Sequence, residues 1–183
     1  SPCEFGADIS LHSATKYLSG HSDVMGGIIL TNQSDLAETL RSRRFYTGAN
    51  MDPHSAWLLR RSLHTLEIRL EKHAQTTLKL VEFLKTRTEI KKIYYPEIDG
   101  LQLKKYPTLI FIDVKDEMIT KYADFHSSLK LFSTGTGMAC VTSMIAQPYT
   151  GSHASMEECE KQDMGLSKNT LRLSFGMEAP EDL

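Results

Sequence analysis

The chain has 183 residues, of which 40% are hydrophobic and 24% are charged, and its formal net charge is −2. That size and composition allow a sizeable buried core and place the chain among globular proteins, either as one large domain or as parts of two. The near-neutral charge and the dispersed lysines exclude a nucleic-acid surface, which would gather basic residues on one face. No stretch approaches the about 20 apolar residues that a membrane span needs, and the start lacks the pattern of a signal peptide.

The cysteines indicate the compartment. Cys3, Cys140 and Cys159 are too few and too irregularly placed for a disulfide framework or a zinc site. This pattern favours a reducing environment. We therefore expect a cytoplasmic protein with no nucleic-acid partner and no membrane partner.

The first third of the chain predicts one strand and two helices. The Gly26–Gly27 pair precedes a short apolar run over 28–31, which predicts a buried strand. A helix over 34–44 follows. Asp52 as N-cap and Pro53 at the first helical position begin the next helix. Apolar residues then recur at spacings of three and four and predict one continuous helix of about eight turns that bridges two packing units: Leu59, Leu63, Leu66, Leu70, Ala74, Thr77, Val81 and Leu84.

The rest of the chain has a different texture, with short elements of alternating type. Strands interleaved with a helix predict a small α/β sandwich in which the helices cover one face of a sheet. The expected strands lie at 90–95, 109–114, 130–132, 141–145 and 171–175, and the expected helix lies at 117–129.

Lys16 lies in a run of small and hydroxyl-bearing residues. Ser13 and Thr15, three and one positions before it, place two hydroxyl donors beside one amine. A cofactor aldehyde bound as a Schiff base needs an accessible amine, and a phosphate on that cofactor needs short hydroxyl donors. The same spacing equally fits an exposed lysine in a polar turn.

Three segments carry a family resemblance. The segment 6–27 resembles the pyridoxal-phosphate attachment segment of the Cys/Met-metabolism, or trans-sulfuration, enzymes, which include cystathionine gamma-synthase, cystathionine lyases and methionine gamma-lyase. The segment 57–73 is similar to the long helix that follows the lysine in that family, although Ser62 and His64 replace the usual Gly and Lys. The segment 171–183 is similar to the carboxyl-terminal signature.

The resemblance implies a cofactor site at the first segment. Lys16 would be the catalytic residue that forms the Schiff base with pyridoxal 5'-phosphate and moves protons. Ser13 and Thr15 would bind the phosphate of the cofactor. The family's aspartate for the pyridine nitrogen, its stacking aromatic residue and its glycine-rich phosphate loop match nothing in this chain.

The resemblance also implies a site for a small amino-acid substrate. Arg172 would bind the substrate carboxylate, unless it faces solvent from its strand. Relatives also contact this carboxylate through the serine region of a Ser-Leu-Gly-Gly run. Counting back from Pro148 without a gap puts Gly137 at the serine position, whereas a small shift puts Thr136 there. Gly135 and Gly137 also fit a turn that binds nothing.

The expected fold class is α/β, with the end of the large PLP-dependent transferase (fold type I) domain followed by a small carboxyl-terminal α/β sandwich domain. The expected parts are a remnant of the cofactor domain over 1–54, a connecting helix over 55–86 and the carboxyl-terminal domain over 87–183. The implied function is part of a PLP-dependent lyase or transferase of sulfur-containing amino acids, in a homotetramer built from dimers. The alternative is a catalytically incompetent fragment or a non-catalytic subunit.

Two other hypotheses of function involve the same region. Ser13 and Lys16 form an S-x-x-K pattern, in which Ser13 would be the nucleophile of an acyl-transfer enzyme and Lys16 its base, but the usual partner motifs are absent. A metal cluster is the second hypothesis, with His12, His21 and Asp23 as its ligands. Their spacing is not that of metal ligands on a helix, so we expect no metal.

Overall fold

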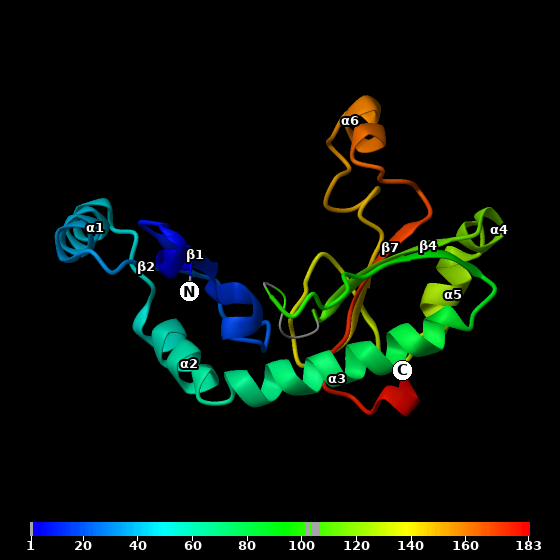
Figure 1. The fold of residues 1–183 in the computed structure, drawn as a ribbon, viewed down its shortest axis with the longest axis horizontal. Helices are drawn as coiled ribbons and strands as arrows, with labels where there is room; N and C mark the ends of the chain where they lie inside the picture. The colour runs from blue at the N-terminus through cyan, green and yellow to red at the C-terminus, as the bar shows by residue number, and fades with distance from the viewer. Residues whose placement is uncertain (1, 102, 104–106) are drawn as a thin grey trace. The chain divides into compact units, whose positions relative to one another are not determined.

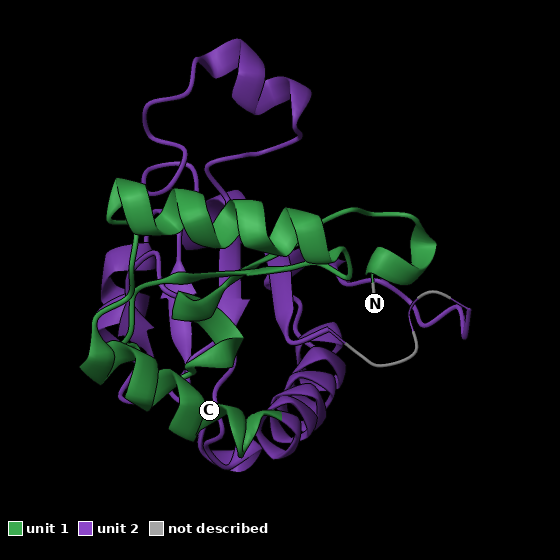
Figure 2. Ribbon diagram, turned by 90° about the vertical axis from the view of Figure 1, so that its left-hand side faces the viewer, with its two compact units in different colours: residues 1–66 green, residues 67–183 purple. Residues whose placement is uncertain are grey.

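The computed structural model describes residues 2–101, 103 and 107–183. The chain divides into two compact units, residues 1–66 and 67–183, which Figure 2 distinguishes by colour.

The first unit is built around a two-stranded antiparallel sheet. Strand β1 pairs with β2 in a register that places Ser13 opposite Gly27. A short π-helix, η2, follows β1 directly, and its Ala14 forms a small buried core with Val24 and Leu59. The elements are η1 (Pro2–Phe5), β1 (Ser10–Ser13), η2 (Ala14–Leu18), β2 (Gly27–Leu30), α1 (Ser34–Thr47) and α2 (Pro53–Leu63).

The predicted strand and helix starts of this region are confirmed, but two predictions are wrong. The strand is not buried, because Ile29 and Leu30 of β2 are 50% and 51% exposed, and the helix is not continuous. The Asp52 carboxylate accepts a hydrogen bond of 2.9 Å from the Ser55 N–H, as expected of an N-cap. Helix α2 ends at Leu63, and α3 (Leu66–Lys85) begins after a turn. In that turn the Thr65 N–H and hydroxyl both donate to the Ser62 carbonyl at 3.2 Å. The apolar periodicity continues across this turn, so the sequence gives no sign of it. The domain boundaries stay a prediction.

The second unit contains a five-stranded sheet in the order β3-β4-β7-β6-β5. All neighbouring strands are antiparallel except β5 and β6. Besides α3, the elements are β3 (Ile90–Tyr94), β4 (Leu109–Val114), α4 (Asp116–Ile119), α5 (Tyr122–Ser128), β5 (Ser133–Thr134), β6 (Met144–Ala146), α6 (Glu158–Asp163), β7 (Thr170–Ser174) and η3 (Pro180–Asp182).

The predicted strands at 90–95, 109–114 and 171–175 are confirmed to within one residue. The predicted helix over 117–129 is two short helices, α4 and α5. The strand expected at 130–132 lies at 133–134, and the strand expected at 141–145 is shortened to Met144–Ala146 because the preceding residues form a loop. Strand β1 and helix α6 are additional to the prediction.

The core of the second unit lies between α3 and one face of the sheet. Alternate residues of β4 are buried, so Ile110, Ile112 and Val114 face Leu80 and Val81 of α3. Figure 1 shows α3 and α5 on the same side of β4 and β7, which confirms the expected covering of one face. Among the described residues, no helix has the length and apolar character of a membrane span.

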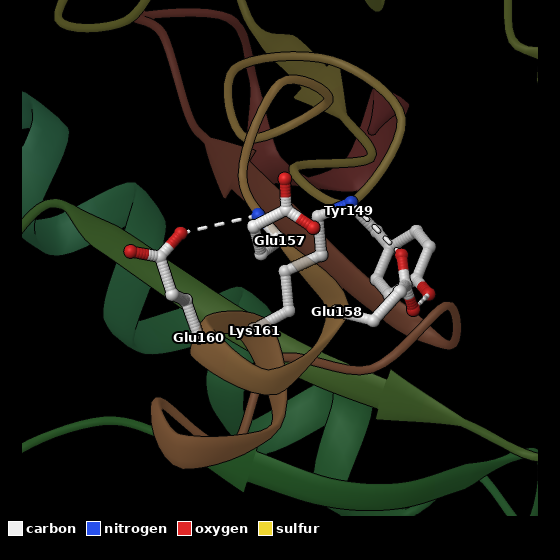
Figure 3. A network of polar contacts seen from close by, with 5 residues as sticks. All are labelled: Tyr149, Glu157, Glu158, Glu160 and Lys161. Carbon is white, nitrogen blue, oxygen red and sulfur yellow. Dashed lines mark hydrogen bonds and ion pairs between the residues drawn. The ribbon is translucent and has the colours of Figure 1, made fainter.

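Helix α6 stands away from the sheet and is held by local polar contacts (Figure 3). The Tyr149 hydroxyl and the Lys161 ammonium both donate to the carboxylate of Glu158, and the Lys161 ammonium also lies 4.5 Å from the centroid of the Tyr149 ring. The hydrogen bond from Tyr149, followed by that from Lys161, lowers the pKa of Glu158. The hydrogen bond with Glu158 raises the pKa of Tyr149.

His73 ties α3 to the end of β7. Its side chain is fully buried, and Nδ1 donates a hydrogen bond of 2.7 Å to the Phe175 carbonyl. Burial is the main cause that lowers the pKa of His73, and the positive charge of Arg69 adds to it, while the hydrogen bond to Phe175 opposes it. His73 is therefore neutral in the folded unit at neutral pH.

We predict that His73 makes the folded state less stable as the pH falls. Above the unfolded-state pKa of about 6.5, neither state is charged at this position and the stability is fully present. Below it the unfolded state takes up a proton that buried His73 does not, so the free energy of unfolding falls by up to about 1.4 kcal/mol per pH unit until the folded pKa is reached. Urea unfolding between about pH 7.5 and 5.5 measures this slope. His73→Asn keeps a donor for Phe175 without the titration and should flatten the slope; an unchanged slope would contradict the assignment.

Candidate active site

Lys16 lies in the middle of η2, immediately after β1. The helix is tightened at its end, where the Gly20 N–H donates to the Lys16 carbonyl at 2.8 Å, and the backbone of Lys16 itself leaves helical geometry (φ −93°, ψ −131°). The side chain is half-buried. Within the described part of the chain, the Lys16 ammonium has no hydrogen bond or ion pair. The fold thus places a lysine in a defined backbone setting and leaves its amine available.

Thr15 is held against Gly26 by two hydrogen bonds. The Thr15 hydroxyl accepts from the Gly26 N–H at 3.0 Å and donates to the Gly26 carbonyl over a longer 3.4 Å. The same carbonyl accepts from the Ala14 N–H at 2.9 Å. A Cβ at Gly26 would lie 2.3 Å from the Met51 methyl, so the residue has little room for a side chain. The 3.0 Å bond from the Gly26 N–H fixes the position of the Thr15 hydroxyl oxygen. The 3.4 Å bond to the Gly26 carbonyl is weak, so the hydroxyl proton can turn to a better acceptor.

Ser13 closes β1 and is an exposed residue. Its backbone pairs with Gly27, the residue after the one that holds Thr15. Among the described residues, no hydrogen bond joins Ser13 to Lys16. This arrangement lacks the nucleophile-to-base contact that an S-x-x-K acyl-transfer site requires.

Arg172 occupies the middle of β7, on the face opposite the core residues Leu171 and Leu173. It is only 6% exposed, between its register partners Phe111 of β4 and Ala146 of β6. The alternative that Arg172 faces solvent is therefore wrong. Burial lowers the pKa of its guanidinium.

The guanidinium of Arg172 has only one polar contact among the described residues. Its Nη2 donates to the Gly137 carbonyl at 2.7 Å, and its Nε has no hydrogen-bond partner. It forms no ion pair within the described ranges. A buried cation without an anionic partner is costly, so this site favours the binding of an anion.

Gly137 begins a loop over 137–143, which we call the 137–143 loop. Ala139 is 1% exposed and has φ of +68°, a left-handed conformation that an alanine rarely adopts. Its N–H donates to the buried Ser174 hydroxyl at 2.9 Å, and the Met177 N–H donates to the Val141 carbonyl at 2.8 Å. The loop is thus bonded along β7 and the residues that follow it.

Ser143 ends the loop in a pair with Glu178. One carboxylate oxygen of Glu178 accepts from the Ser143 N–H at 2.6 Å, and the other accepts from the Ser143 hydroxyl at 2.9 Å. The Gly176 N–H donates to the same hydroxyl at 2.9 Å. A Cβ at Gly176 would lie 2.4 Å from the Val141 carbonyl oxygen, so only glycine allows this approach of two backbones.

The structure brings together Arg172 and Gly137, but not Thr136. Thr136 is exposed, and among the described residues its side chain forms no hydrogen bond with Arg172. Gly26, Ser143 and Glu178 were not predicted as site residues. Glu178 lies in the 171–183 segment that resembles the family signature, four residues after the end of β7.

Two residues of the hypothetical metal cluster, His12 and His21, form other contacts. His12 Nε2 lies 2.8 Å from the Ser10 hydroxyl, and His21 Nδ1 lies 2.5 Å from the Ser19 carbonyl oxygen. Within the part of the chain that the structure describes, no three His, Cys, Asp or Glu side chains are grouped to hold a metal ion.

Comparison with known proteins gives consistent results. A family model described as Cys/Met metabolism PLP-dependent enzyme matches residues 1–183. The chain is 37% identical over 190 residues to a cystathionine beta-lyase of Lactococcus lactis subsp. cremoris (strain MG1363), covering 100% of this chain and 50% of that protein. It is 35% identical to a cystathionine gamma-lyase of Bacillus subtilis (strain 168), again covering 50% of that protein.

Solved structures resemble the chain over the same extent. A cystathionine gamma synthase from Xanthomonas oryzae pv. oryzae, in complex with cystathionine, is 31% identical with a TM-score of 0.90 and is covered over 49% of its length. A cystathionine gamma-lyase from Lactobacillus plantarum, complexed with L-serine, is 29% identical with a TM-score of 0.89. The chain spans about half the length of the relatives that it matches.

Proposed function

Because the chain belongs to the Cys/Met metabolism family of PLP-dependent enzymes, we propose that its protein is a lyase or transferase acting on sulfur-containing amino acids. The observation that carries the substrate class is Arg172, a buried guanidinium with a donor to spare and no ion pair among the described residues. An amino-acid carboxylate matches its planar set of donors.

The residues of η2 fit the family cofactor. Pyridoxal 5'-phosphate supplies an aldehyde and an electron sink when it is bound. Lys16 offers an amine without a partner among the described residues, and Ser13, an exposed residue, offers a hydroxyl. Thr15 offers a hydroxyl whose oxygen is fixed by the Gly26 N–H. Two hydroxyls and one amine are the donor set that a phosphate and an aldehyde require, so these three residues would hold the group.

Each residue then has a defined task. The Lys16 amine takes a proton from the α-carbon of the substrate and returns one later, as a general base and acid. Ser13 and Thr15 hold the phosphate, which fixes the reacting atoms relative to Lys16. Arg172 orients the substrate through its carboxylate, with Gly137 fixing one side of the guanidinium.

The finer assignments follow from the relatives. Structures of two of them hold cystathionine and L-serine, so we propose a substrate of cystathionine type, whose thioether sulfur is bonded to the β-carbon of one amino-acid half and the γ-carbon of the other. We also propose a cytoplasmic homotetramer built from dimers, as the family resemblance implies.

Replacing Lys16 by Ala in the complete protein should abolish turnover, because Lys16 carries the only side-chain amine of η2. Borohydride reduction followed by peptide mass spectrometry should place the cofactor on Lys16 in the parent protein and nowhere in the variant. Lys16→Arg is the control that retains a cation of similar length. Full turnover in Lys16→Ala would refute the assignment.

Replacing Arg172 by Ala should weaken substrate binding more than cofactor binding. A charge-assisted bidentate contact with a carboxylate contributes roughly 1.5–3 kcal/mol. Steady-state kinetics should therefore show a fall of about tenfold or more in kcat/KM, with an unchanged cofactor titration. Removing this buried side chain also affects the stability of the fold, so the thermal unfolding of the variant is measured as a control. An unchanged kcat/KM in a folded variant would exclude this role.

The second candidate is a catalytically incompetent piece, which the half-length match to the relatives favours. On this candidate, the isolated chain of 183 residues folds in part but does not catalyse the reaction. Lys16, Ser13 and Thr15 alone would neither orient the cofactor nor activate it electronically. A cofactor titration and a lyase assay on the isolated chain test this. Stoichiometric tight binding with efficient turnover would show the candidate to be wrong.

A further inference from the structure

We propose that Glu178 is a positioning residue for recognition of the substrate carboxylate, acting through Ser143 and the 137–143 loop on Arg172. This inference rests on the proposed function, because it assumes that Arg172 binds the carboxylate. Glu178 itself does not touch Arg172 in any described contact.

The first step is the pair between Glu178 and Ser143. The two carboxylate oxygens accept from the backbone and the hydroxyl of one residue, at 2.6 and 2.9 Å. Bonds to an ionised acceptor are stronger than neutral ones, and two of them fix both the position and the orientation of Ser143. Ser143 is fully buried, so water is a poor substitute for these contacts.

The second step is the transfer of that constraint along the loop. The Ser143 hydroxyl also accepts a hydrogen bond from the Gly176 N–H. Nearer the other end of the loop, the Ala139 N–H donates to the Ser174 hydroxyl of β7. The left-handed backbone of Ala139 is unfavourable unless such contacts enforce it. The loop is thus held from both ends in a conformation that it would otherwise leave.

The third step is the contact with the guanidinium. The loop begins at Gly137, whose carbonyl is the only described hydrogen-bond acceptor for Arg172. A shift of this carbonyl would let the guanidinium rotate away from the orientation in which its other donors meet the substrate. Because bidentate recognition depends on the plane of the guanidinium, a small rotation would weaken carboxylate binding selectively.

The experiment compares two inhibitors that differ only in the carboxylate. L-Serine and ethanolamine are measured as inhibitors of the complete, cofactor-loaded protein, with L-cystathionine as substrate. The readout is the ratio of the ethanolamine inhibition constant to the L-serine inhibition constant. Glu178→Gln keeps the size of the side chain but turns an amide nitrogen toward one of the two Ser143 donors, and it should lower this ratio about tenfold.

Four further variants complete the test, one of which is Arg172→Lys. Ser143→Ala breaks the same pair from the other side and should lower the ratio similarly, so it also serves if Glu178→Gln does not fold. The double variant of Glu178→Gln and Ser143→Ala should lower the ratio no further than the more impaired single variant does, because both changes remove the same interaction. Glu181→Gln is the matched control, since Glu181 is an exposed glutamate paired only with Lys79 among the described residues, and it should leave the ratio unchanged.

The outcomes separate the two proposals. A lower ratio in folded Glu178→Gln or Ser143→Ala, with the cofactor absorbance retained, supports the inference. An equal change for both inhibitors, or no change, overturns it and leaves Glu178 a stabilising residue only. If Arg172→Lys also leaves the ratio unchanged, then the carboxylate role of Arg172 is wrong, and the inference fails with it. If Arg172→Lys lowers the ratio but Glu178→Gln and Ser143→Ala do not, only the inference about Glu178 fails.

Discussion

The burial of the Arg172 guanidinium is the constraint around which the second unit is arranged. Removing a cation from water is costly unless other groups offset it, and here one carbonyl faces the guanidinium. The strand that carries Arg172 puts its neighbours Leu171 and Leu173 into the core on the opposite face. The side of the sheet that faces α3 is therefore apolar, while the other side carries Arg172 between Phe111 and Ala146, next to the 137–143 loop.

Two glycines show how the backbone takes part in both candidate sites. Gly26 gives its N–H and carbonyl to Thr15, and Gly176 gives its N–H to Ser143. In each case the space of a side chain is occupied by another atom, the Met51 methyl or the Val141 carbonyl oxygen. The Gly176 contact is the stricter of the two, because a backbone carbonyl yields less than the end of a methionine side chain.

Local patterns predicted much of the fold, but not the contacts of the site. The Asp52–Pro53 cap and the alternating residues of β4 are visible in sequence because short-range geometry determines them. The turn at Thr65 is not, since the apolar spacing runs through it and the hydrogen bonds from Thr65 to the Ser62 carbonyl have no signal in the sequence. The hydroxyl-rich run around Lys16 was also visible in the sequence, whereas the role of Arg172 came from a family resemblance. Nothing local could pair Ser143 with Glu178, because their contact depends on how the sheet folds.

The sequence separation of these contacts has a consequence for folding. The bonds from Arg172 to Gly137, from Ala139 to Ser174 and from Ser143 to Glu178 each join residues 35 positions apart. Contacts of such separation close a large loop of chain before they return any free energy, so they form after the local helices and turns. The 137–143 loop cannot order until β7 has joined the sheet. The Arg172 guanidinium therefore gains its contact with Gly137 only in that late step, and a chain arrested before it would have its helices without the ordered loop.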